Sequence, residues 1–123
     1  MKNLSENLPI YIRITERVKD AILSGENKEE GQLPSTTFMS KEYGINIATV
    51  NKAVNILVDE GLVYKKRGIG MFVKKGAINQ LVTERRKVFK ERYVKATLIE
   101  AKRLNINVEE LQAIVKEIYD QTK

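Results

Sequence analysis

Residues 46–73 read NIATVNKAVNILVDEGLVYKKRGIGMFV, and this stretch decides the fold. Its first half begins with Asn46, a good helix cap, and ends at Gly61, where a helix can stop. Between them the apolar residues fall three and four positions apart, at helical spacing: Val50, Ala53, Val54, Leu57 and Val58. Two β-rich segments follow, on either side of RGIG at 67–70, whose glycines suit a hairpin loop. We therefore expect a helix followed directly by a β-hairpin.

The residues before this stretch predict two more helices. From Ile10 to Ser24, apolar residues recur at four-residue steps and a glycine follows. After a polar loop from Glu26 to Gln32, Ser35 can cap a short helix that ends at Gly44. Two consecutive helices joined by a tight turn and followed by a hairpin form a winged helix-turn-helix. We expect this domain to occupy residues 1–76.

The composition excludes most catalytic chemistry. The 123 residues contain no Cys and no His, which removes thiolate and imidazole metal ligands, cysteine nucleophiles and most hydrolase triads. The adjacent carboxylate pairs do not suggest an acid–base site, because neighbours on a helix point apart and a pair in a loop is solvated; these pairs are Glu29-Glu30, Asp59-Glu60 and Glu109-Glu110. We expect no enzyme, no catalytic residue, no metal site and no cofactor.

Two features of the sequence bear on where the protein is located: the residues at its start and the length of its apolar runs. MKNLSENLPI lacks the continuous apolar stretch of a signal peptide, and no later run approaches the roughly 18 apolar residues of a membrane span. We expect a soluble, cytoplasmic protein that does not contact the membrane.

The formal net charge of +6 is unevenly distributed. Residues 1–60 carry 7 basic and 9 acidic groups, and residues 84–123 carry 10 basic and 7 acidic groups. Residues 61–83 contain no acidic group, and their cations lie on and beside the predicted hairpin: Lys65, Lys66, Arg67, Lys74 and Lys75. A cationic hairpin suits phosphate contacts, which position a protein on DNA without reading its sequence. We therefore expect double-stranded DNA as a partner.

Taken together, these segments resemble the N-terminal domain of the GntR family of bacterial transcriptional regulators. The resemblance covers about residues 9–73. It is carried by PIY at 9–11, LPS at 33–35, Thr49-Val50 with Ala53, EGL at 60–62 and RGIGMFV at 67–73. It implies that the helix after Asn46 is the recognition helix, which enters a DNA groove, and that the hairpin is the wing. The function it implies is sequence-specific transcriptional regulation, as a repressor.

The outward face of the recognition helix holds residues that can contact bases. Asn can bond adenine in a bidentate way, Lys can donate to guanine or phosphate, and an Ala or Ile side chain can meet a thymine methyl. Many family members have Arg at the positions where this chain has Thr37, Ile47 and Asn51, so we expect an Asn-rich readout in place of an arginine one. The candidate DNA-binding residues are Ser35, Thr36, Thr37, Asn46, Ile47, Ala48, Thr49, Asn51, Lys52, Asn55, Lys65, Lys66, Arg67, Gly68, Ile69 and Gly70.

Residues 77–123 predict a two-helix tail. A long amphipathic helix should run from Ile78 to Leu104, and Asn107 with Glu110 matches a capping box that starts a second helix. These two helices cannot bury all of their apolar faces on one another, so the excess should pack against the winged-helix domain or against a second subunit, and we favour the second subunit. Such a short tail resembles the YtrA-type branch of the family, in which two C-terminal helices mainly dimerise the protein. A homodimer would present two recognition helices to an inverted-repeat operator. The candidate dimerisation residues are Leu81, Val82, Phe89, Tyr93, Leu111, Ile114, Val115 and Ile118.

One alternative stays open at this point. A winged helix can serve as a protein-interaction module that never touches DNA, although such a module need not have an acid-free wing and its outward helix face would more often be apolar. The sequence does not define the operator, the regulated genes, an effector ligand or the choice between repression and activation.

Overall fold

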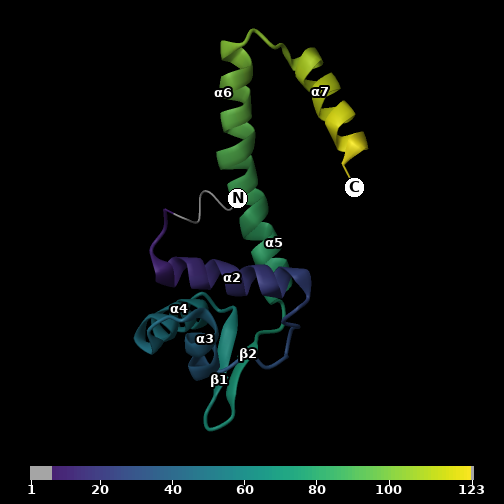
Figure 1. The fold of residues 1–123 in the computed structure, drawn as a ribbon. Coiled ribbons are helices and arrows are strands. Elements are labelled where there is room, and N and C mark those ends of the chain that lie inside the picture. The colour runs from purple at the N-terminus through teal and green to yellow at the C-terminus, as the bar shows by residue number, and fades with distance from the viewer. Residues whose placement is uncertain (1–6, 123) are drawn as a thin grey trace. The chain divides into compact units, whose positions relative to one another are not determined.

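The computed structural model describes residues 7–122, which are mostly helical and include one antiparallel β-hairpin (Figure 1). This architecture confirms the predicted fold class of a mainly α protein with a small hairpin. The chain divides into two compact units, residues 1–83 and residues 84–123.

The first unit contains three helices whose ends follow the predicted caps. They are α2 (Ile10–Ser24), α3 (Thr36–Tyr43) and α4 (Ile47–Asp59). The side-chain oxygens of Ser35 and Asn46 accept hydrogen bonds from backbone N–H groups in the first turns of α3 and α4, at 3.0 and 2.8 Å. Each cap satisfies a backbone donor that would otherwise lack a partner at the helix start, which fixes where the helix begins.

The hairpin consists of β1 (Val63–Lys66) and β2 (Gly70–Val73). The strands are antiparallel, and their register pairs the first residue of β1 with the last of β2. In Figure 1 the loop between them extends away from the helices. The short loop and the alternating burial of β2 place one face of the hairpin on the core and leave the other to solvent.

The end of the predicted polar loop pairs with the free edge of β2. The backbone N–H groups of Glu30 and Leu33 donate to carbonyls of Val73 and Met71, at 2.7 and 2.8 Å, and Gln32 forms a β-bridge with Phe72. The expectation of a plain loop from Glu26 to Gln32 is therefore wrong at its C-terminal end. A pairing this short has no periodic side-chain pattern, so the sequence carries little sign of it.

The core of the first unit lies between the three helices and the inner face of the hairpin. α4 packs against both α2 and α3 and also contacts β1. The buried apolar residues are Ile14, Val18, Ile22, Leu33, Met39, Val50, Ala53, Val54, Leu57, Leu62, Val63, Met71, Val73, Ala77 and Leu81. The apolar stripes predicted for α2 and α4 thus supply much of the core.

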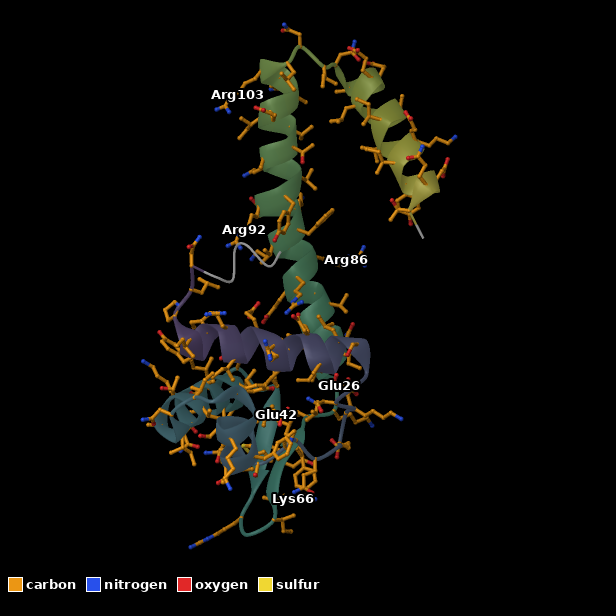
Figure 2. All side chains as sticks on the ribbon, viewed as in Figure 1. Glu26, Glu42, Lys66, Arg86, Arg92 and Arg103 are labelled. Carbon is orange, nitrogen blue, oxygen red and sulfur yellow. The ribbon has the colours of Figure 1, made fainter. Side chains whose placement is uncertain are left out.

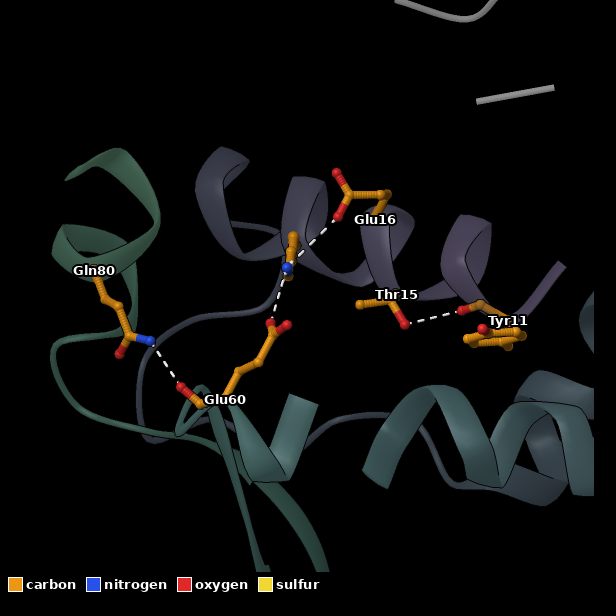
Figure 3. A network of polar contacts seen from close by, with 6 residues as sticks. Tyr11, Thr15, Glu16, Glu60 and Gln80 are labelled. Carbon is orange, nitrogen blue, oxygen red and sulfur yellow. Dashed lines mark hydrogen bonds and ion pairs between the residues drawn. The ribbon is translucent and has the colours of Figure 1, made fainter. Parts of the chain in front are cut away.

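Polar contacts tie the elements of this unit together around α2 (Figure 3). The Lys19 ammonium lies 2.9 Å from a carboxylate oxygen of Glu60 and 3.6 Å from one of Glu16. The side-chain amide of Gln80 donates to the backbone carbonyl of Glu60 at 2.8 Å. The end of α4 is therefore linked to α2 on one side and to the helix that follows the hairpin on the other.

That following helix, α5 (Ala77–Val88), begins inside the first unit. Leu81 is only 1% exposed and belongs to the core just described. The prediction that Leu81 faces a second subunit is therefore wrong, because the core of its own chain covers it.

The second unit continues the same helical stretch. A π-helical segment, η1 (Phe89–Val94), separates α5 from α6 (Lys95–Arg103). The predicted helix from Ile78 to Leu104 therefore forms, but with a π-helical section that periodicity did not indicate. The last helix, α7 (Val108–Gln121), starts at the predicted capping box, in which Asn107 and Glu110 each accept the other's backbone N–H.

Candidate nucleic-acid interface

One face of α4 is polar and exposed, opposite the face that packs in the core. Its buried side is Val50, Ala53, Val54 and Leu57. Its exposed side holds Ala48, Asn51, Lys52 and Asn55, all of which are candidates from the sequence. This is the geometry of a helix held rigidly by its apolar stripe while its other side can enter a groove.

The Lys52 side chain is held at the edge of this face by an aromatic ring. Its ammonium lies 4.0 Å from the centroid of the Tyr11 ring at the start of α2, within the range of a cation–π contact. Tyr11 itself is half-buried against the core. The positive charge of Lys52 therefore has a preferred position before any ligand binds, a feature that the sequence did not predict.

The exposed face of α4 continues onto the hairpin. The ammonium of Lys65 in β1 donates to the side-chain oxygen of Asn55 at 2.9 Å. Both residues are exposed, so the contact adds little to stability. It does join two groups of predicted residues, from the recognition helix and the wing, into one surface, which we call the α4–wing surface and define as Ala48, Asn51, Lys52, Asn55, Lys65, Lys66, Arg67, Gly68 and Ile69.

The wing presents cations and two unusual backbone conformations. Lys66, labelled in Figure 2, places its ammonium 4.8 Å from the centroid of the Phe72 ring. Arg67 is exposed in the loop, and Ile69 beside it is 63% exposed. Gly68 and Gly70 have φ values of +77° and +145°, a backbone conformation that residues with a side chain rarely adopt. The glycines are therefore required for the loop shape that presents Arg67.

The remaining candidates lie at the starts of α3 and α4. Ser35 and Asn46 use their side-chain oxygens as helix caps, so each has a structural role of its own. Thr37 and Ile47 are exposed. Thr36, Thr49 and, in the wing, Gly70 are half-buried. None of the sixteen predicted DNA-binding residues is buried in the core, and contact of each with DNA stays a prediction.

Glu30 and Glu29 accept hydrogen bonds from residues of the hairpin and of the chain that follows it. The Glu30 carboxylate accepts hydrogen bonds from the Tyr64 hydroxyl at 3.3 Å and from the Lys75 backbone N–H at 3.1 Å. Desolvation, followed by the Glu30 charge and hydrogen bond, raises the pKa of Tyr64. Glu29 accepts the Ile78 backbone N–H at 3.0 Å. Backbone hydrogen bonds from Gly76 and Ile78 lower the pKa of Glu29, which is consistent with a carboxylate at the start of α5.

Sequence reasoning missed Gln32. Its side-chain amide donates to the backbone carbonyl of Ile69 in the wing loop at 3.0 Å, across 37 residues of sequence. Gln32 lies in a polar stretch in which no sequence pattern distinguishes it from its neighbours. The contact with Ile69 can therefore be recognised only in the folded structure.

Some kinds of site are absent from the part of the chain that is described. Within residues 7–122 no helix has both the length and the apolar character needed to cross a membrane. In the same range, no group of acidic side chains is clustered so as to hold a metal ion.

Three packed helices and a hairpin that adjoins the exposed face of the third define a winged helix-turn-helix domain. The family described as bacterial regulatory proteins, gntR family, matches residues 10–73. The chain belongs to this family.

Two regulators of Bacillus subtilis (strain 168) illustrate the relationship. The chain is 31% identical to the HTH-type transcriptional repressor YtrA over 115 residues, which are 94% of this chain and 88% of YtrA. It is 38% identical to the HTH-type transcriptional repressor NagR over 78 residues, which are 63% of this chain but only 32% of NagR. The chain thus spans about a third of NagR and most of YtrA, in agreement with the short branch indicated by the sequence.

Solved structures show the same fold. A GntR-family putative transcriptional regulator from Bacteroides thetaiotaomicron matches with a TM-score of 0.77 at 31% identity, covering 94% of this chain and 100% of that one. The DNA-binding domain of AraR in complex with operator ORX1 matches with a TM-score of 0.52 at 30% identity, covering 54% of this chain and 80% of that one.

Proposed function

We propose that this protein is a sequence-specific, double-stranded-DNA-binding transcriptional regulator that acts as a repressor. The observation that carries the proposal is the α4–wing surface, in which the polar face of a recognition helix is joined to a cationic hairpin through the 2.9 Å Lys65–Asn55 contact. The operator complex of the AraR domain and the repressor function in the names of NagR and YtrA support it.

The two parts of the α4–wing surface, the exposed face of α4 and the wing, would contact different parts of the DNA. The α4 side chains Asn51, Lys52 and Asn55 would meet base edges in the major groove, where amides and ammonium groups discriminate between base pairs. The wing cations would meet phosphates, which add affinity independent of sequence. Sequence choice would then come from α4, and most of the salt dependence from the wing.

We also propose that the protein works as a homodimer, with residues 1–76 binding DNA and the C-terminal helices joining the subunits. The second unit leaves large apolar side chains exposed, among them Phe89 at 59% and Ile118 at 56%. Ile114 and Val115 in this unit are also exposed, as is Val82 near the end of the first unit, while Tyr93 and Leu111 are half-buried. When one chain leaves this many large apolar side chains exposed, a second subunit that covers them is favoured. A symmetric dimer would bind an inverted-repeat operator.

The protein-interaction alternative has less support. A winged helix that binds another protein is expected to present an apolar outward face, whereas the exposed face of α4 is formed mainly by amides and a lysine. The wing adds cations with no acidic residue between positions 61 and 83. Both features suit a polyanion better than a protein surface.

Selection of bound duplexes from random DNA tests the proposal. The full chain should enrich a sequence with two inverted half-sites, bound at least about 10³-fold more tightly than a shuffled duplex of equal length. Binding of both duplexes with equal affinity, or of neither, would contradict the proposal.

A further inference from the structure

The wing loop is tied to the body of the first unit by one side chain. Gln32 belongs to the segment that pairs with β2, and its backbone forms a bridge with Phe72. From there its side chain reaches the loop and donates from Nε2 to the Ile69 carbonyl at 3.0 Å. This side-chain bond holds the Ile69–Gly70 part of the loop, at the end of the wing that carries the exposed Arg67.

The backbone of the wing loop lies close to the end of the Gln32 side chain. A Cβ atom on Gly70 would lie 2.5 Å from Nε2 of Gln32 and 3.5 Å from its amide carbon. A position that combines this approach with a φ of +145° accepts glycine alone without rearrangement. Gly70 therefore serves two purposes, to turn the chain and to leave room for the Gln32 amide.

Gln32 also lies close to the start of the helix-turn-helix. Leu33 is buried in the core and bonds the Met71 carbonyl, and Ser35, three residues after Gln32, is the cap of α3. The wing loop is thus connected, through one hydrogen bond and a short anchored segment, to the N-terminus of α3.

We infer that Gln32 is a positioning residue for DNA binding: it holds the wing loop in the orientation that presents Arg67 to the phosphates. The inference rests on the proposed function. A loop fixed before binding loses less conformational freedom in the complex, so the bond should increase affinity although Gln32 itself need not touch DNA. Since the bond is exposed, it should matter more for the loop than for the stability of the domain.

A double-mutant cycle on the full chain tests this role. The variant Gln32→Met keeps the length of the side chain and removes the donor, and Gln121→Met, at the exposed end of α7, is the matched control. With a fluorescent duplex recovered by selection from random DNA, Gln32→Met should weaken binding about three- to tenfold, the size of one lost hydrogen bond. In the Arg67→Ala background the same change should have almost no effect, because the group that it positions is gone.

A loop-specific measurement separates positioning from general stabilisation. In the DNA-free protein, backbone amide order parameters of residues 67–70 should fall toward the flexible range, below about 0.6, in Gln32→Met and in Gln32→Ala, while those of α4 stay unchanged. Three results would each overturn the inference: equal losses of DNA affinity with and without Arg67, an unchanged affinity in both Gln32 variants, or unchanged order parameters of residues 67–70. If the wild-type chain binds no duplex, the proposed function fails first. If it binds and the Gln32 variants bind equally well, only the role of Gln32 fails.

Discussion

Removing the wing cations should change how DNA binding depends on salt. In the variant Lys65→Ala, Lys66→Ala, Arg67→Ala, three exposed positive charges on one hairpin are lost while the glycines and the apolar strand positions remain. Each phosphate contact contributes about 0.9 to the slope of log K against log salt on duplex DNA. Three contacts therefore set an upper limit of about 2.7 per wing for the decrease in slope.

The structure indicates a value somewhat below this limit. Lys65 already donates to Asn55 at 2.9 Å, and Lys66 lies 4.8 Å from the Phe72 centroid. Both ammonium groups would exchange a contact within the protein for one with phosphate, whereas Arg67 is exposed in the loop. We expect a decrease of about 2 per wing, with unchanged preference between the selected duplex and a shuffled one.

Fluorescence anisotropy over a series of salt concentrations measures the slope. The charge-matched control Lys102→Ala, Arg103→Ala, Lys116→Ala removes three cations from α6 and α7 and should leave the slope at its wild-type value. A wing variant with the wild-type slope, or a control with an equal decrease, would show that phosphates meet another surface.

Three further predictions concern the remainder of the chain. Asn107→Ala removes one half of the capping box and should destabilise α7 by about 1 kcal/mol, seen as a lower midpoint in circular dichroism melting; an unchanged midpoint would contradict this. Phe89→Asp and Ile114→Asp each place a charge on the exposed apolar side chains of the second unit and should yield monomers in sedimentation velocity; intact dimers in both variants would refute the interface. The lowered pKa of Glu29 stabilises the folded state above the ordinary carboxyl value of 4.5, and this contribution is lost as the pH falls through the folded pKa. Glu29→Gln should therefore reduce the difference in urea stability between pH 7 and pH 3, and an identical difference would mean that the carboxylate does not contribute.

Local signals were enough to predict the three helices of the winged domain. The caps Ser35 and Asn46 and the stop at Gly44 act within one turn of the chain, so their effect can be predicted from neighbouring residues. The apolar stripe of α4 likewise depends only on helical spacing, and its exposed face follows from it. These elements place most of the candidate surface.

Contacts between distant segments could not be predicted in this way. The Gln32–Ile69 bond and the pairing of residues 30–33 with β2 depend on how the chain folds back on itself. Leu81 lies on an amphipathic helix whose apolar stripe shows that something covers it, but periodicity cannot distinguish a partner subunit from its own domain. The π-helical segment at 89–94 likewise has no sequence signature in a pattern based on 3.6 residues per turn.

The central claim is that α4 reads the bases while the wing holds the phosphates, and the specificity ratio tests it most directly. This ratio is the affinity for the selected duplex divided by that for a shuffled duplex, measured at one salt concentration for the wild type and for Asn51→Ala, Lys52→Ala. Since a good base contact contributes about 1–3 kcal/mol of discrimination, the ratio should fall at least about tenfold in the variant. An unchanged ratio, with binding to both duplexes weakened equally, would contradict the account.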